Sequence, residues 1–216
     1  MSELVIKIKK HVQDVFKHDA TGHDWFHIER VYKMAVHLQL IEGGDMELIE
    51  LAALLHDISD HKMNGGILNA GGNVAYELLM EYGCSEIKAQ NVKEIVDGVS
   101  YKGANVEDNM KSIEGKIVQD ADRLDAIGAI GIARAFAFGG NKNRPMYLPD
   151  SKPEMHSSFE SYANSKSHTV NHFYEKLLLL KNRLNTKSAL KIGQERHNFI
   201  ENYLQQFYNE WDTIIE

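Results

Sequence analysis

All three prolines of the 216-residue chain lie in one short window, at positions 145, 149 and 153. Proline interrupts a helix because it lacks the backbone N–H of the helical hydrogen bond and its ring clashes with the preceding turn. The long stretches on either side of this window are therefore free to form uninterrupted helices. No stretch of the sequence shows the sustained polar–apolar alternation that is typical of strands. The sequence predicts an all-α fold.

Apolar residues repeat at helical spacing along most of the chain. Two of these stripes consist of residues three or four positions apart: Ile28, Val31, Ala35 and Leu38, and Ile113, Ile117, Ala121, Leu124 and Ile127. The segment LIELAALL (48–55) is apolar nearly all round, which indicates a central helix. Glycine pairs and other breaks separate such segments, as connections between helices do. We expect a helical bundle of about eight helices.

The length suits one large domain with a sizeable core, so we expect a single domain over residues 1–216. A content of 43% hydrophobic and 25% charged residues is that of an ordinary globular protein. The part of the chain around the prolines, at about 140–166, is too long for a plain connector. We expect it to form a flexible loop or lid.

Charge and composition exclude several classes of partner. A formal net charge of −7 provides no basic field for nucleic acid, so an anionic substrate needs cations placed locally. The lone Cys84 excludes an intramolecular disulfide and a cysteine-based zinc site, which fits a reducing compartment. The sequence has no signal-peptide pattern and no apolar run long enough to span a membrane. We expect a cytoplasmic protein, and no pattern indicates an oligomeric state.

Three short stretches carry the chemistry. GHDWFHIERV places His27 in line with Val31, Met34 and Leu38, so its imidazole faces inward. LAALLHD ends the central helix on His56 and Asp57, and VQDADRLDA places Asp122 on another inward line. A carboxylate on an apolar face is costly unless it is paired or binds a metal. Each residue alone has a plain structural explanation, as a core histidine or a polar helix end, so the set carries the argument.

In this order, His27, the pair His56–Asp57 and Asp122 resemble the H…HD…D signature of the HD-domain metal-dependent phosphohydrolase superfamily. The flanking stretches GHDWFHIERVYKMA, LAALLHDISDHK, VQDADRLDAIGAIGIARAF and the tail from HFYEKLLLL onward are similar to those of small bacterial HD hydrolases. The resemblance covers most of the chain. It implies an all-α HD domain and a metal-dependent hydrolase of phosphate compounds.

The resemblance implies that His27, His56, Asp57 and Asp122 bind one divalent metal ion per chain. Two imidazoles and two carboxylates suit Mn²⁺, Mg²⁺, Co²⁺, Ni²⁺ or Fe²⁺, of which we favour Mn²⁺. Four protein ligands in an octahedral field leave one position for water and one for a phosphate oxygen. The metal would lower the pKa of the water and neutralise charge on the phosphate.

Further residues near the signature are expected to assist. Four of them are placed to orient the ligands: His23, Asp24, His61 and Asp120. Catalysis is assigned to Asp57, to Asp60 as a proton acceptor and to Lys62, although a solvated helix end explains Asp60 equally well.

The substrate phosphates need cations close to the metal. Arg30 lies one turn after His27, and Lys62 follows the HD pair closely. In the tail, Lys176 lies four residues after His172, and Arg196 lines up with apolar residues of the last helix. An arginine on such a line has a second explanation, because its stem can pack while its head reaches water.

The preferred function is that of a nucleoside triphosphate pyrophosphohydrolase, which releases pyrophosphate. A nucleotidase or a guanosine tetraphosphate hydrolase would use the same site. A di-iron oxygenase would need two more inward histidines, for which His23 and His61 are the nearby supply. A non-catalytic nucleotide or metal sensor is the third class. The complete ligand set and the adjacent cations favour an enzyme acting on a small phosphate compound. We expect this substrate to be a nucleotide, and we expect neither nucleic acid nor a membrane as a partner.

Overall fold

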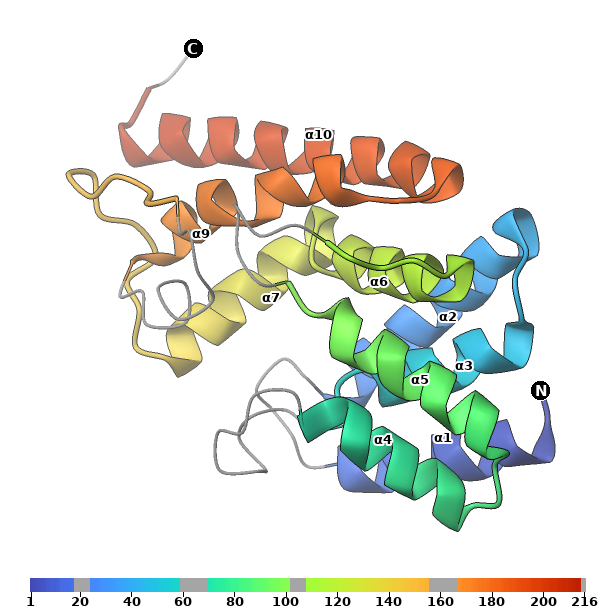
Figure 1. The fold of residues 1–216 in the computed structure, drawn as a ribbon. Helices are drawn as coiled ribbons and strands as arrows, with labels where there is room; N and C mark the ends of the chain where they lie inside the picture. Colours follow the sequence, from blue (N-terminus) through green and yellow to red (C-terminus); the bar gives the residue numbers. More distant parts are fainter. Residues whose placement is uncertain (18–23, 59–69, 102–107, 156–166, 215–216) are drawn as a thin grey trace. The chain divides into compact units, whose positions relative to one another are not determined.

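The structure is a computed structural model that describes residues 1–17, 24–58, 70–101, 108–155 and 167–214. Within these ranges it contains nine α-helices, one 3₁₀ helix and no strand, so the predicted all-α fold is confirmed (Figure 1). The described residues divide into two compact units. The first holds 1–17, 24–58, 70–101 and 108–122, and the second holds 123–155 and 167–214. The single domain over 1–216 stays a prediction.

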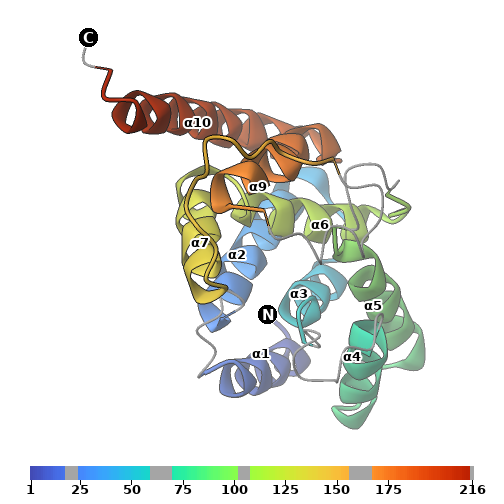
Figure 2. The same ribbon diagram turned by 90° about the vertical axis from the view of Figure 1, so that its left-hand side faces the viewer.

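Five helices belong wholly to the first unit. They are α1 (Glu3–Val15), α2 (Trp25–Glu42), α3 (Met46–Leu55), α4 (Ala70–Glu81) and α5 (Glu86–Val99). Helix α3 packs against α1, α2 and α5, and Figure 2 shows it between α2 and α5. Every residue of α3 from Leu48 to Leu55 is buried, as expected for the apolar central helix. Helix α6 (Ile113–Asp125) begins in this unit.

A tight turn joins α2 to α3. Gly43 and Gly44 have φ angles of 85° and 91°, a region that glycine adopts without the strain a Cβ would cause. Asp45 then begins α3, because its side chain accepts a hydrogen bond from the backbone N–H of Leu48. The two helices therefore form an antiparallel hairpin, which brings the start of α2 beside the end of α3.

Four helical elements follow α6 in the described part of the second unit. They are α7 (Gly128–Asn141), α9 (Thr169–Glu175), the 3₁₀ helix η1 (Leu177–Arg183) and α10 (Lys187–Trp211). Helix α10 packs against α7 and η1, and α9 contacts both α7 and η1. Aromatic rings fill the contact between α7 and α10, where Phe136 lies against Tyr203 and Phe207. The aromatic side chains of the last helix thus pack on a ring of α7.

The predicted lid at about 140–166 is described only up to residue 155, and residues 156–166 lie outside the described ranges. Its first part is hydrogen-bonded to α9: Thr169 and Val170 donate to the carbonyls of Pro145 and Met146, each at 3.0 Å. The backbone N–H of Glu154 donates to the Glu175 carboxylate. The mobility of the loop stays a prediction.

In the described part of the chain, no helix combines the length and the apolar character needed to cross a membrane.

Candidate metal centre

His27 is held in the first turn of α2. The Asp24 side chain caps this helix and accepts a hydrogen bond of 2.8 Å from the backbone N–H of His27. An N-cap of this kind satisfies a backbone donor that the first turn leaves unpaired. The His27 side chain is 1% exposed, so the predicted inward orientation agrees with its burial. Asp24 thereby helps to position the imidazole through the backbone.

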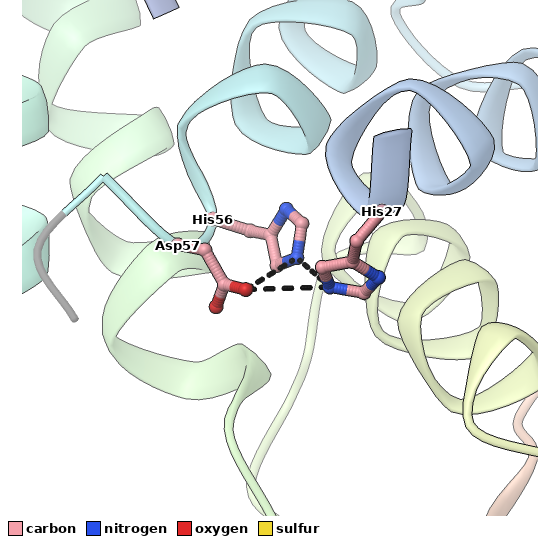
Figure 3. A group of neighbouring side chains, drawn as sticks. All are labelled: His27, His56 and Asp57. Carbon is pink, nitrogen blue, oxygen red and sulfur yellow. Dashed lines mark hydrogen bonds and ion pairs between the residues drawn. The ribbon is translucent and has the colours of Figure 1, made fainter. Parts of the chain in front are cut away.

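His56 directly follows α3, and its ring orientation is determined by one hydrogen bond. Its Nδ1 lies 2.8 Å from the carbonyl oxygen of Ala53. Since a carbonyl only accepts, Nδ1 carries the hydrogen, and in the neutral ring Nε2 keeps a lone pair. That Nε2 lies 3.2 Å from Nε2 of His27. Two buried imidazoles, one from α2 and one directly after α3, therefore meet nitrogen to nitrogen (Figure 3).

Two carboxylates complete the cluster. Asp57 Oδ2 lies 3.3 Å from Nε2 of His27 and 3.5 Å from Nε2 of His56. Asp122 Oδ1, from α6, lies 3.6 Å and 3.9 Å from the same two nitrogens. The carboxylates are 21% and 29% exposed, whereas both imidazoles are 1% exposed. The four predicted ligands thus form a cluster whose imidazoles are buried and whose carboxylates are partly exposed.

The dimensions of the cluster fit a small divalent cation. One ligand atom each from His27, His56 and Asp57 lies within 4.8 Å of the others (Figure 3). Octahedral ligands at about 2.1 Å from a metal are about 3 Å from each other along an edge. The separations in the cluster are close to this value, and Nε2 of His56 has its lone pair available. The mixed nitrogen and oxygen donors suit the first-row divalent metals and Mg²⁺.

Of the other residues expected near the metal, only some fall in the described ranges. His23, Asp60, His61 and Lys62 lie outside them. Asp120 is fully buried on α6, two residues before Asp122. Arg30 lies on α2 one turn after His27 and is partly exposed. Lys176 and Arg196 both belong to the second unit.

Arg196 has a structural partner within the second unit. Its guanidinium Nη1 donates to the carbonyl oxygen of Leu124. Its stem lies so close to Gly128 that a Cβ there would stand 3.0 Å from Arg196 Cγ. Burial lowers the pKa of the guanidinium, and the nearby Asp125 carboxylate partly offsets this. These contacts account for the position of Arg196 on an apolar line, and its contact with substrate stays a prediction.

The structure adds two residues that the sequence analysis did not assign to a site. His172 on α9 lies near Lys176 and Arg144, and its pKa is lowered to about 3, first by burial and then by these two positive charges. The imidazole is therefore neutral at physiological pH. The four-residue spacing from His172 to Lys176 indicated from the sequence that these two side chains lie near each other. Arg144 gave none, because the backbone bonds of residues 145 and 146 to α9 bring it there.

Comparison with known proteins agrees with the signature and the fold. The model of the HD domain family matches residues 25–127, a range that includes all four clustered residues. YpgQ of Bacillus subtilis is 37% identical over 201 residues, which cover 93% of this chain and 90% of YpgQ.

Solved structures are similar over nearly the whole chain. An HD-superfamily hydrolase from Bacillus thuringiensis is 42% identical, with a TM-score of 0.74 and 97% of each chain covered. The structure of Bacillus subtilis YpgQ in complex with ADP is 35% identical, with a TM-score of 0.74, and the match covers 95% of this chain and 97% of that one. The chain therefore belongs to the HD-domain superfamily of metal-dependent phosphohydrolases.

Proposed function

We propose that this protein hydrolyses nucleotides at a single divalent metal ion held by His27, His56, Asp57 and Asp122. The observation that carries the proposal is the convergence of these four side chains, with both Asp carboxylates within 3.9 Å of the two facing Nε2 atoms. Mn²⁺ is the preferred metal because the donor set mixes imidazole nitrogen and carboxylate oxygen. The same donors would accept Mg²⁺, Co²⁺, Ni²⁺ or Fe²⁺.

A divalent cation supplies two effects when bound: it lowers the pKa of a water molecule and neutralises charge on a phosphate group. The residues of this chain hold and orient it. The carbonyl of Ala53 fixes the His56 tautomer, and Asp24 fixes the backbone at His27. Asp60 is proposed as the acceptor of the proton from water. Lys62 and Arg30 are proposed as cations that contact the phosphates.

A nucleoside triphosphate is the proposed substrate, with release of pyrophosphate. The similarity to YpgQ, whose structure contains ADP, supports a nucleotide ligand. Lys176 is a further proposed phosphate contact, because it lies with Arg144 near the neutral His172. Two cations beside a neutral imidazole offer charge and hydrogen-bond donors to an anion.

The proposal is tested with purified protein, Mn²⁺ and a panel of ribo- and deoxyribonucleoside mono-, di- and triphosphates. Pyrophosphate and orthophosphate are measured separately. We expect pyrophosphate from triphosphates, and a loss of at least about 10²-fold in Asp57→Ala because the charge-stabilising ion is lost. Asp14→Ala is the matched control, since Asp14 is an exposed carboxylate on α1.

Other outcomes distinguish the remaining functions. Orthophosphate from monophosphates identifies a nucleotidase, and activity on guanosine tetraphosphate alone identifies that hydrolase. Inert protein that contains two irons per chain identifies an oxygenase. Tight nucleotide binding without turnover, whichever of the five metals is added, identifies a sensor and refutes hydrolysis.

A further inference from the structure

Helix α3 contains one charged residue in the middle of its apolar sequence. Glu50 is 5% exposed, and its neighbours on both sides along the helix are buried leucine, isoleucine and alanine. A carboxylate in such surroundings loses its hydration and needs a partner. The hydroxyl of Tyr32, on α2, supplies one by donating a hydrogen bond of 2.6 Å to Glu50 Oε1. The proposed chemistry uses neither residue.

This bond differs in kind from the rest of the α2–α3 contact. Other buried side chains of the two helices, such as Val31 and Leu51, are apolar and pack without a strong directional preference. A hydrogen bond weakens steeply when its length or angle changes. The Tyr32 ring is also held from α1, where the Lys9 ammonium lies 4.8 Å from the ring centroid. Contacts from α1 and α3 thus hold Tyr32 in place, and its hydrogen bond to Glu50 links α3 to that position.

The bond lies in the same register as the metal cluster. Along the antiparallel hairpin, Tyr32 stands five residues after His27, and Glu50 stands six residues before His56. At 1.5 Å per residue, the two pairs are separated by roughly 8 Å along the helices. A slip of α3 along α2 would therefore break the Tyr32–Glu50 bond and misalign the two imidazoles together.

We propose that Tyr32 and Glu50 are positioning residues, whose hydrogen bond sets the register of α3 on α2 and thereby the spacing of His27 from His56 and Asp57. The inference rests on the proposed function in one respect, namely that these three residues bind the metal. Metal ligands must be held to within about 0.5 Å of their productive geometry. The directional hydrogen bond between Tyr32 and Glu50 fixes the position of α3 along α2 more narrowly than apolar packing alone does.

The buried charge of Glu50 offers a different explanation, because a carboxylate on α3 also attracts a cation from a distance. Two substitutions separate the explanations. Tyr32→Phe removes the hydrogen bond and keeps the charge. Glu50→Gln removes the charge and keeps an amide oxygen that accepts from the Tyr32 hydroxyl. Leu79→Ala on α4 serves as the control for general loss of stability, because Leu79 is fully buried and α4 packs mainly on α5.

The experiment measures the affinity for Mn²⁺ alone, by electron paramagnetic resonance of the free ion, with the thermal midpoint of each variant. We expect Tyr32→Phe to weaken Mn²⁺ binding by about tenfold or more, as loss of an outer support of a metal site does. Glu50→Gln, which keeps an acceptor for the Tyr32 hydroxyl, is expected to bind Mn²⁺ within about threefold of wild type. The visible absorption of the Co²⁺-loaded protein should change in Tyr32→Phe and stay as wild type in Leu79→Ala.

Two results overturn the proposal: unchanged Mn²⁺ affinity in Tyr32→Phe, or a loss in Glu50→Gln as large as that in Tyr32→Phe, which assigns the effect to charge. A loss in Leu79→Ala equal to that in Tyr32→Phe also overturns it, since general destabilisation then suffices. If wild type itself binds no Mn²⁺, or Asp57→Ala binds it normally, the proposed metal site fails instead. The two failures are thus told apart by the wild type and Asp57→Ala.

Discussion

Each unit contains a histidine site, and the two sites have opposite electrostatic surroundings. In the first unit, His27 and His56 face the carboxylates of Asp57 and Asp122. In the second, His172 lies near the cations Arg144 and Lys176. One residue type therefore marks two kinds of site, and the neighbouring charges decide which. The first arrangement suits a cation, and the second suits an anion such as a phosphate.

The largest expected effect is the stabilisation of the folded protein by Mn²⁺ bound in the first unit. Mn²⁺ at a hundred times its dissociation constant should raise the free energy of unfolding by about 2.7 kcal/mol, because it binds the folded state. Denaturant unfolding with and without Mn²⁺ measures this. Asp122→Asn should lose most of the increment, whereas the exposed Asp14→Asn on α1 should keep it. An undiminished increment in Asp122→Asn would remove Asp122 from the ligand set.

A smaller effect is expected at the cations of the second unit. Lys176→Ala and Arg144→Ala should each raise KM for the nucleotide by about tenfold, since a charged hydrogen bond to phosphate contributes about 1.5–3 kcal/mol. Mn²⁺ affinity should stay as in wild type, and Lys191→Ala, an exposed residue of α10, should change neither. Steady-state kinetics with a metal titration tests this contrast, and weaker Mn²⁺ binding in Lys176→Ala would contradict it.

A third effect is a pH dependence of stability that belongs to His172. Its pKa falls from 6.5 to about 3 on folding because of burial and the nearby cations. Between these values the unfolded chain binds a proton that the folded chain does not, so stability falls as the pH falls from about 6.5 toward about 3. His172→Gln should flatten this part of the curve, which urea unfolding across the range measures. An unchanged slope would show that other groups cause it.

The contrast also shows which features the sequence predicts. Helical spacing placed His27 and Asp122 on inward lines, where a polar residue is an anomaly, and the resemblance to the HD signature joined them to His56 and Asp57 as ligands. Glu50 was an anomaly of the same kind inside the apolar segment 48–55, but its partner Tyr32 depends on the hairpin register. Arg196 followed the apolar line of α10, yet only the folded chain shows that it donates to Leu124. Local periodicity reports which face a side chain occupies, and tertiary contacts decide what it meets there.

The turn at Gly43–Gly44 has a consequence for the entropy of assembling the proposed metal centre. It brings His27 and Asp57 together across 30 residues of chain, whereas Asp122 lies 95 residues after His27. Loop-closure entropy grows only with the logarithm of length, so recruiting Asp122 costs about 1 kcal/mol more than closing the hairpin. Three of the four side chains thus belong to contacts of low sequence separation, the kind that form fastest. The fourth side chain ties the centre to a distant part of the chain.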